Sequence, residues 1–179
     1  MLIFPFGLPP ERVIEQAHRQ NIAVGVTATC VRVAQDIALA GADFVLARSW
    51  EAGGHRGSFD PSQLGEELPV FALVRCLQDC LSIPIVAAGG MMDGRDIAEV
   101  LAAGATAAQL GTALLCCDEA GTPPPHTAIS PARWREPDTL YFGFQSVSAG
   151  KEYRKIRSMT VAKLMATIEQ ELSQAATRP

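Results

Sequence analysis

Residues 83–112 limit the possible folds of this chain more than any other stretch. They consist of an apolar run, a Gly-Gly pair, a helical pattern that ends at Gly104, a second apolar run and a further glycine turn. Both runs are apolar almost throughout rather than alternating, which is typical of parallel strands covered on both faces. This strand–helix–strand unit predicts an α/β fold built on a parallel sheet.

The same unit recurs along most of the chain. Apolar runs predict strands at residues 2–6, 22–28, 42–47, 83–88 and 107–115, with helical patterns between them. Gly41 and Gly104 stand in matching Ala-Gly-Ala sequences, and each is expected to end a helix just before the next strand. About five such units predict part of an eightfold β/α (TIM-type) barrel. We therefore expect either that a second copy or another polypeptide covers the open sheet edges, or that the sequence is a fragment of a longer protein.

The loops after the last two predicted strands suggest a phosphate site. Gly89, Gly90, Gly111 and Thr112 fall where β/α barrels commonly bind phosphate through main-chain amides. Glycine suits such a loop because it has no Cβ to keep an anion away and because it reaches positive φ at little cost. The alternative interpretation is that these residues belong to ordinary turns, in which glycine is common.

A second glycine loop follows the strand predicted at residues 42–47. Residues 51–57 read EAGGHRG, so Gly53, Gly54 and Gly57 surround His55 at the carboxyl end of a strand, where barrel enzymes keep their chemistry. Histidine exchanges protons near neutral pH, which makes His55 the best candidate for a catalytic residue. A solvated surface histidine is the alternative.

Composition excludes several classes of protein. The chain has 179 residues, 48% of them hydrophobic, and a net charge of −4 without a basic block, which disfavours nucleic-acid binding. It contains no apolar run near the roughly 20 residues of a membrane span and no recognisable secretory signal, so we expect a cytoplasmic protein. The five cysteines lack metal-ligand spacing, and we expect no metal site but reduced thiols that fill apolar space.

The pattern changes after residue 121. Prolines at positions 123–125, 131 and 137 disfavour regular structure, so residues 122–138 are expected to be a linker. Beyond it, Ser158 or Thr160 is expected to cap a final helix that packs on the barrel through one apolar side, formed by Val161, Leu164, Met165, Ile168 and Leu172. We therefore divide the chain into a partial barrel (1–121), the linker, and a C-terminal helical segment (139–179).

Three motifs in order give the chain a family resemblance. EAGGHRG at 51–57, AAGG at 87–90 followed by Asp-Gly-Arg at 93–95, and QLGT at 109–112 together resemble the FMN-dependent nitronate monooxygenases. The resemblance implies that the predicted strands correspond to strands 4 to 8 of that barrel. It also implies an oxidoreductase that uses molecular oxygen on a small nitronate or nitroalkane.

The resemblance also assigns roles to residues. Residues 109–112 are implied to contact FMN near its phosphate, and His55 is implied to act beside the flavin as a base or as a group that orients the anionic nitronate. The full set of implied cofactor contacts is Arg48, Gly53, Gly54, Gly89, Gly90, Gln109, Leu110, Gly111 and Thr112.

The sequence departs from the family pattern at several places. Arg48 stands where the family usually carries glutamine, and a guanidinium can only donate hydrogen bonds. The first three units of the family barrel have no counterpart, and residues 122–138 replace a longer segment that covers the active site. Two alternatives therefore stay open: a flavin-dependent enoyl-acyl-carrier or NADH:quinone reductase, and an inactive truncated barrel that folds only with a partner.

Overall fold

A computed structural model describes residues 1–54, 67–122, 139–142, 145–148 and 150–177. These residues form two compact units. Unit 1 contains residues 1–50, 67–88 and 100–109, and unit 2 contains residues 51–54, 89–99, 110–122 and the described residues from 139 onward.

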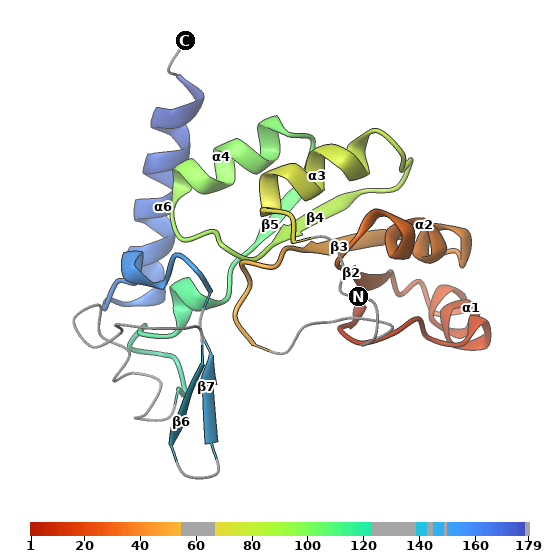
Figure 1. Ribbon diagram of the computed structural model, residues 1–179, viewed down its shortest axis with the longest axis horizontal. Coiled ribbons are helices and arrows are strands. Elements are labelled where there is room, and N and C mark those ends of the chain that lie inside the picture. Colours follow the sequence, from red (N-terminus) through yellow and green to blue (C-terminus); the bar gives the residue numbers. More distant parts are fainter. Residues whose placement is uncertain (55–66, 123–138, 143–144, 149, 178–179) are drawn as a thin grey trace. The chain divides into compact units, whose positions relative to one another are not determined.

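Unit 1 is a parallel sheet with its connecting helices (Figure 1). Its strands run in chain order: β1 (Leu2–Phe4), β2 (Val24–Ala28), β3 (Phe44–Arg48), β4 (Ile85–Ala88) and β5 (Ala107–Gln109). Helices α1 (Glu11–Arg19), α2 (Val31–Leu39) and α3 (Val70–Gln78) lie between successive strands in the sequence, as does α4 (Gly94–Ala102), whose residues 94–99 belong to unit 2. Because every crossover moves to the next strand in the same direction, crossovers of one hand place α1, α2 and α3 on one face of the sheet, as in a β/α barrel.

The core of unit 1 lies where α1, α2 and α3 pack on the central strands. Every residue of β2 is buried, and Gly25 lies so close to the Phe44 ring that a Cβ at this position would overlap it. The helices bury residues spaced at helical intervals, with Ile14 and Ala17 on α1, Val33 and Ile37 on α2, and Leu73 and Leu77 on α3.

Three of the helices end in the same backbone motif. Gly41 and Gly104 have φ of +85° and +111°, as predicted, and each follows a helix by two residues. The amide of Ala105 donates to the Val100 carbonyl and that of Gly104 to the Leu101 carbonyl, which is the Schellman pattern. Asn21, at φ of 55°, ends α1 in the same way.

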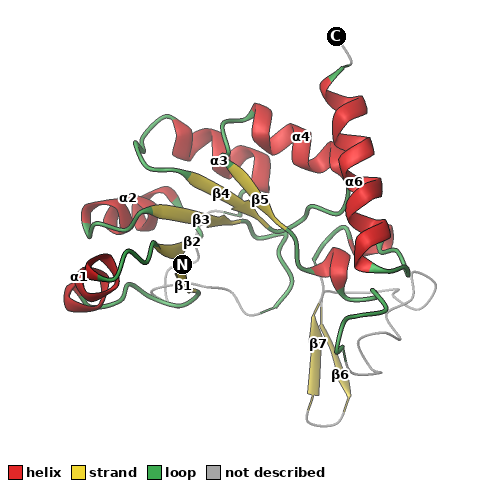
Figure 2. Cartoon of the chain, turned by 180° about the vertical axis from the view of Figure 1, so that it is seen from behind, coloured by secondary structure: helices red, strands yellow, loops and turns green. Residues whose placement is uncertain are grey.

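Unit 2 contains the described residues beyond β5. A short 3₁₀ turn, η1 (Thr112–Leu114), follows β5, and a hairpin of β6 (Thr139–Phe142) and β7 (Gln145–Ser148) precedes a second turn, η2 (Tyr153–Lys155). The sequence did not predict this hairpin. The last element, α6 (Val161–Ala176), is one uninterrupted helix (Figure 2) whose first turn is capped by the Thr160 side chain, which accepts from the Lys163 amide.

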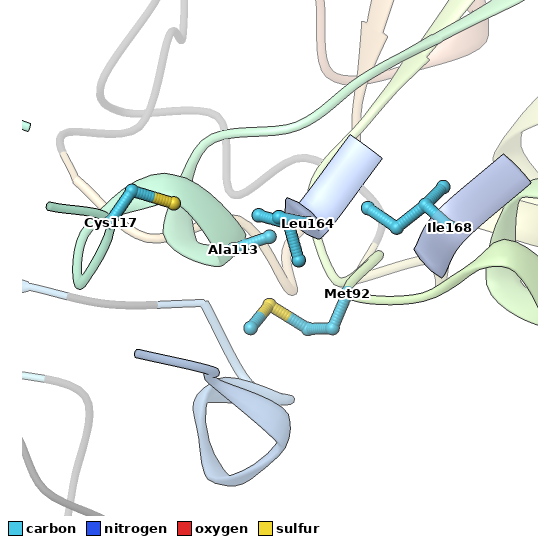
Figure 3. Packing of buried hydrophobic residues seen from close by; sticks show 5 residues of the cluster. All are labelled: Met92, Ala113, Cys117, Leu164 and Ile168. Atoms are coloured by element: carbon cyan, nitrogen blue, oxygen red, sulfur yellow. The ribbon is translucent and has the colours of Figure 1, made fainter. Parts of the chain in front are cut away.

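A hydrophobic cluster holds unit 2 together (Figure 3). Leu164 and Ile168 of α6 pack with Met92, Ala113 and Cys117, all at most 5% exposed. The predicted apolar side of α6 is therefore correct for Leu164 and Ile168. It is wrong for Met165, which is 48% exposed because it lies one residue around the helix from Leu164.

Two further expectations need correction. The fifth strand ends at Gln109 and not at 115, because the Leu114 amide turns back to the Gly111 carbonyl. The five cysteines are free, but only Cys117 is buried, whereas Cys76 and Cys80 are exposed. These two lie four residues apart, away from the side of α3 that buries Leu73 and Leu77.

Candidate functional site

Two predicted site residues of unit 1 lie in one row at the carboxyl edge of the sheet. Arg48, Ala88 and Gln109 are the last residues of β3, β4 and β5, and each is in register with the next. Arg48 is partly buried, and burial lowers the pKa of its guanidinium from the ordinary value. Gln109 is exposed. At this edge, a cationic donor at the end of β3 and an amide at the end of β5 therefore flank Ala88 of β4.

In unit 2, the loops after β3 and β4 are in close contact. A Cβ at Gly89 would lie 2.6 Å from the Ala52 Cβ, and a Cβ at Gly90 would lie 3.0 Å from the Glu51 Cβ. Both glycines also have positive φ, of +96° and +76°. The packing of the chain itself therefore requires glycine at both positions, whatever ligand is present.

Gly111 differs from those two glycines. Its φ is −127°, and a Cβ built there would meet no atom within 4 Å. Nothing in the described part of the chain accepts a hydrogen bond from the amide of Gly111 or of Thr112. Two adjacent main-chain donors with open space beside them suit an anionic oxygen.

The turn that begins at Gly150 joins two of these loops. The buried Gly150 donates its amide to the Thr112 Oγ1 at 2.9 Å, and the Lys151 amide donates to the Glu51 carbonyl at 2.9 Å. A Cβ at Gly150 would lie 3.1 Å from the Glu51 carbonyl oxygen and 3.6 Å from the Gly53 nitrogen. Sequence reasoning missed this turn, whose only signal was an Ala-Gly pair beyond the proline-rich stretch.

A charged cluster lies beside the loop after β4. The Lys155 Nζ is 3.0 Å from Asp96 Oδ1 and 3.5 Å from Asp93 Oδ2. Burial opposes ionisation of Asp93, but hydrogen bonds from the amides of Asp96 and Arg95, together with Lys155, leave its pKa below the ordinary value. Both hydrogen bonds to Asp93 are 3.0 Å long, so its side chain caps the first turn of α4.

The remaining predicted residues are less fully described. Gly53 and Gly54 belong to unit 2, and Gly54 has a φ of +83°. Leu110 borders the hydrophobic cluster of unit 2. His55, the predicted catalytic residue, lies outside the described residues, as do positions 56–66.

Neither a membrane-spanning helix nor a metal-binding cluster is present among the described residues. None of the helices among them is long and apolar enough to cross a membrane. The same part of the chain holds no group of His, Cys, Asp and Glu side chains arranged to bind a metal ion.

Comparison with solved structures identifies the fold. Nitroalkane oxidase from Streptomyces ansochromogenes superposes with a TM-score of 0.88 and 31% identity, over 98% of this chain and 64% of that protein. FabK from Thermotoga maritima superposes with a TM-score of 0.78 over 97% of this chain, but at 21% identity this likeness concerns the fold alone. The predicted fold class, a partial β/α barrel, is thereby confirmed.

Sequence relatives identify the family. Nitronate monooxygenase from Paraburkholderia phytofirmans is 47% identical over 116 residues, which are 65% of this chain and 32% of that protein. A probable nitronate monooxygenase from Staphylococcus saprophyticus is 40% identical over 164 residues, or 90% of this chain and 45% of that protein. The chain thus spans less than half the length of these relatives. The family model for nitronate monooxygenase matches residues 1–178, so the chain belongs to the nitronate monooxygenase family of oxidoreductases.

Proposed function

We propose that this chain carries the FMN-binding loops of an enzyme that oxidises small alkyl nitronates or nitroalkanes with molecular oxygen. The observation that carries the proposal is the meeting of glycine loops in unit 2: Gly89 packs on Ala52, Gly90 on Glu51, and Gly150 on Thr112. These loops follow three neighbouring parallel strands at their carboxyl ends, the edge that bears the ligand sites of β/α barrels. Family membership supports the choice of reaction.

The amides of Gly111 and Thr112 are proposed to hold the phosphate of FMN. The chain itself has no need for glycine at 111, since φ is negative and a Cβ would be unopposed. A bound anion supplies the missing reason, because a side chain there would keep its oxygen from the amides. The residues present therefore fit the phosphate of this cofactor.

The loop after β4 is assigned to an uncharged part of the cofactor. The Glu51 Oε2 lies 3.0 Å from the position of a Cβ at Gly90, and the Lys151 Nζ lies 3.8 Å from Glu51 Oε1. A carboxylate at that place opposes a phosphate but accepts hydrogen bonds from hydroxyl groups. Gly53, Gly54, Gly89 and Gly90 then form the wall beside it.

The residues at the strand ends are assigned to the flavin ring. Gln109 is proposed to bond a polar edge of the ring, because an amide both donates and accepts. Arg48 can only donate, and its partly buried positive charge favours electron density on the ring. When bound, FMN supplies the electron transfer, while these residues position it.

His55 is proposed to take the proton next to a nitro group or to orient the nitronate anion. A neutral imidazole suits the first role and an imidazolium the second, and histidine reaches both forms near neutral pH. In the sequence, His55 directly follows the described residues Glu51–Gly54.

Flavin binding and reduction test the proposal. A folded-state ligand at 100 times its Kd stabilises by about 2.7 kcal/mol, which raises the Tm of a chain of this size by about 5–10 °C. The purified chain with FMN should show this shift, and its flavin should lose visible absorbance when an alkyl nitronate is added without oxygen. H55Q should keep the shift and lose the bleaching.

Other outcomes would identify the alternatives. Bleaching by NAD(P)H with no response to nitronate would favour a flavin-dependent reductase. A colourless protein whose Tm is unchanged by excess FMN would refute cofactor binding and favour a truncated barrel that depends on a partner.

We further propose that a second copy or a complementing polypeptide covers the edges of the sheet. Among the described residues, β1 and β5 each pair with one strand only, and Leu2 and Ile3 of β1 are 42% and 38% exposed. Unpaired edges of this kind promote association. Light scattering should give a mass above that of one chain. The free cysteines support a reducing compartment, and we propose the cytoplasm.

A further inference from the structure

We infer that the turn at residues 150–155 holds the proposed phosphate loop in place, and that Lys155 is the positioning residue that anchors this turn. The inference rests on the proposed function, because it concerns how the amides of Gly111 and Thr112 are kept ready for an anion. It assigns a role in the cofactor site to a part of the chain that follows the last barrel strand by some forty residues in the sequence.

One end of the turn contacts the loops after β3 and β5. The Gly150 amide donates to the Thr112 Oγ1, and the Lys151 amide donates to the Glu51 carbonyl, both at 2.9 Å. Gly150 is buried at this contact, where a Cβ would lie 3.2 Å from the same Thr112 Oγ1. The orientation of Thr112, and of the amide it shares with Gly111, therefore depends on where Gly150 lies.

The other end of the turn is fixed to the loop after β4. The Lys155 Nζ donates to both oxygens of Asp96, at 3.0 and 3.2 Å. Asp96 Oδ2 in turn accepts from the amides of Met92 and Asp93, at 2.8 and 3.2 Å. Lys155 is thus bonded to a carboxylate that the backbone of this loop already holds.

Backbone hydrogen bonds within the turn connect its two ends. The Tyr153 amide donates to the Gly150 carbonyl at 3.0 Å, and the Lys155 amide donates to the Glu152 carbonyl at 2.9 Å. The next residue, Ile156, packs against the hydrophobic cluster of unit 2. A displacement at Lys155 is therefore carried to Gly150 rather than absorbed between them.

Lys155 does not serve as a phosphate ligand in this arrangement. Its ammonium group faces three carboxylates, with Glu152 Oε2 at 3.7 Å in addition to Asp93 and Asp96. Three carboxylates around one ammonium group make the local net charge negative, which opposes the binding of a further anion. Its effect on the cofactor site is through the position of the turn.

The experiment compares K155M with three other variants of the full chain. K155R retains the charge, and D96N removes the ion pair but keeps an oxygen for the Met92 amide. K163M is the matched control, since Lys163 on α6 makes no ion pair with any described residue. Two quantities are measured: the Kd for FMN from flavin fluorescence, and the ³¹P resonance of FMN bound at saturation.

K155M and D96N should bind FMN about tenfold more weakly, the scale of a lost charged hydrogen bond, and should shift the ³¹P resonance of the bound cofactor. K155R should restore both quantities, and K163M should match the unaltered chain. Unchanged affinity in K155M and D96N would overturn the inference. Weaker binding with an unchanged ³¹P resonance would overturn it too, since that result indicates a loss of stability alone. If the unaltered chain binds no FMN, the proposed function itself fails.

Discussion

Replacing Gly94 by alanine tests the packing of α4 on α6 within unit 2. Gly94 is the first residue of α4, and its amide donates to Glu171 Oε2 of α6 at 3.0 Å. A Cβ at this position would overlap the Ile168 carbonyl oxygen and the Leu172 nitrogen, and would lie 2.6 Å from the Glu171 Cβ. Two of these atoms belong to the backbone of a helix, so they cannot rotate away. α6 must shift from the start of α4.

Two opposing effects determine how much G94A changes the free energy of unfolding. Helix propensity alone favours G94A by about 1 kcal/mol, because alanine is a better helix former than glycine. Overpacking costs about 1–3 kcal/mol where side chains can adjust, and more where a helix backbone must move. We expect a net loss of about 2 kcal/mol, which lowers the Tm of a chain of this size by about 4–8 °C.

Thermal unfolding followed by circular dichroism measures the effect. G121A is the matched control, because Gly121 has no atom within 4 Å of a built Cβ and no positive φ. Its Tm should stay within the range of an ordinary surface change, about 0.5 kcal/mol. A Tm of G94A equal to or above that of the unaltered chain would refute the packing argument, since propensity would then dominate.

Three further predictions concern a carboxylate, the core and the phosphate loop. Burial opposes ionisation of Asp43, but hydrogen bonds from the Val24 amide and from His18 leave its pKa below the ordinary value of 3.8. Its stabilising effect is therefore complete above that value and is lost as the pH falls through the folded-state pKa, so D43A should lower the Tm at neutral pH and flatten the acid side of the Tm–pH curve. Leu164 is 1% exposed, and L164A should lower the free energy of unfolding in urea by about 2–5 kcal/mol. A loss below about 1 kcal/mol, close to that of a surface substitution, would contradict its place in the core. G111A should leave the Tm unchanged and weaken FMN binding about tenfold, and the reverse pattern would indicate a purely structural glycine.

The periodic parts of the fold were predictable because their signals are local. Gly41 and Gly104 mark helix ends in the sequence, since few other residues adopt positive φ. Asn21 performs the same task in α1 and was missed, because asparagine is common in many other settings.

The end of the fifth strand was not predictable from hydrophobicity. Residues 110–115 are mostly apolar, and a short apolar run fits a strand or a turn against a core equally well. In the structure, Ala113 is buried in the cluster with Leu164 and Ile168, so the run is apolar because of packing and not because of strand pairing.

The candidate site, too, was only partly predictable from the sequence. Its glycine loops were visible as motifs, and the structure adds a local reason for two of them, the contacts of Gly89 and Gly90 with the loop after β3. The contributions of Gly150 and Lys155 were invisible, because their partners Thr112 and Asp96 lie 38 and 59 residues away in the sequence. Isolated glycine and lysine residues carry no signal of such contacts.

The bond between Glu171 and Gly94 has a practical consequence for shortened forms of the chain. Glu171 Oε2 accepts the first amide of a helix that starts 77 residues earlier, and Oε1 is held by the Arg157 Nη2 at 2.7 Å. Removing residues from the C-terminus as far as Ser173 leaves both hydrogen bonds of Glu171 in place. Removal of Glu171 by a protease or by a stop codon would leave the first amide of α4 without this acceptor and the half-buried Arg157 without this carboxylate. A truncation near the C-terminus would therefore destabilise a helix near the middle of the sequence.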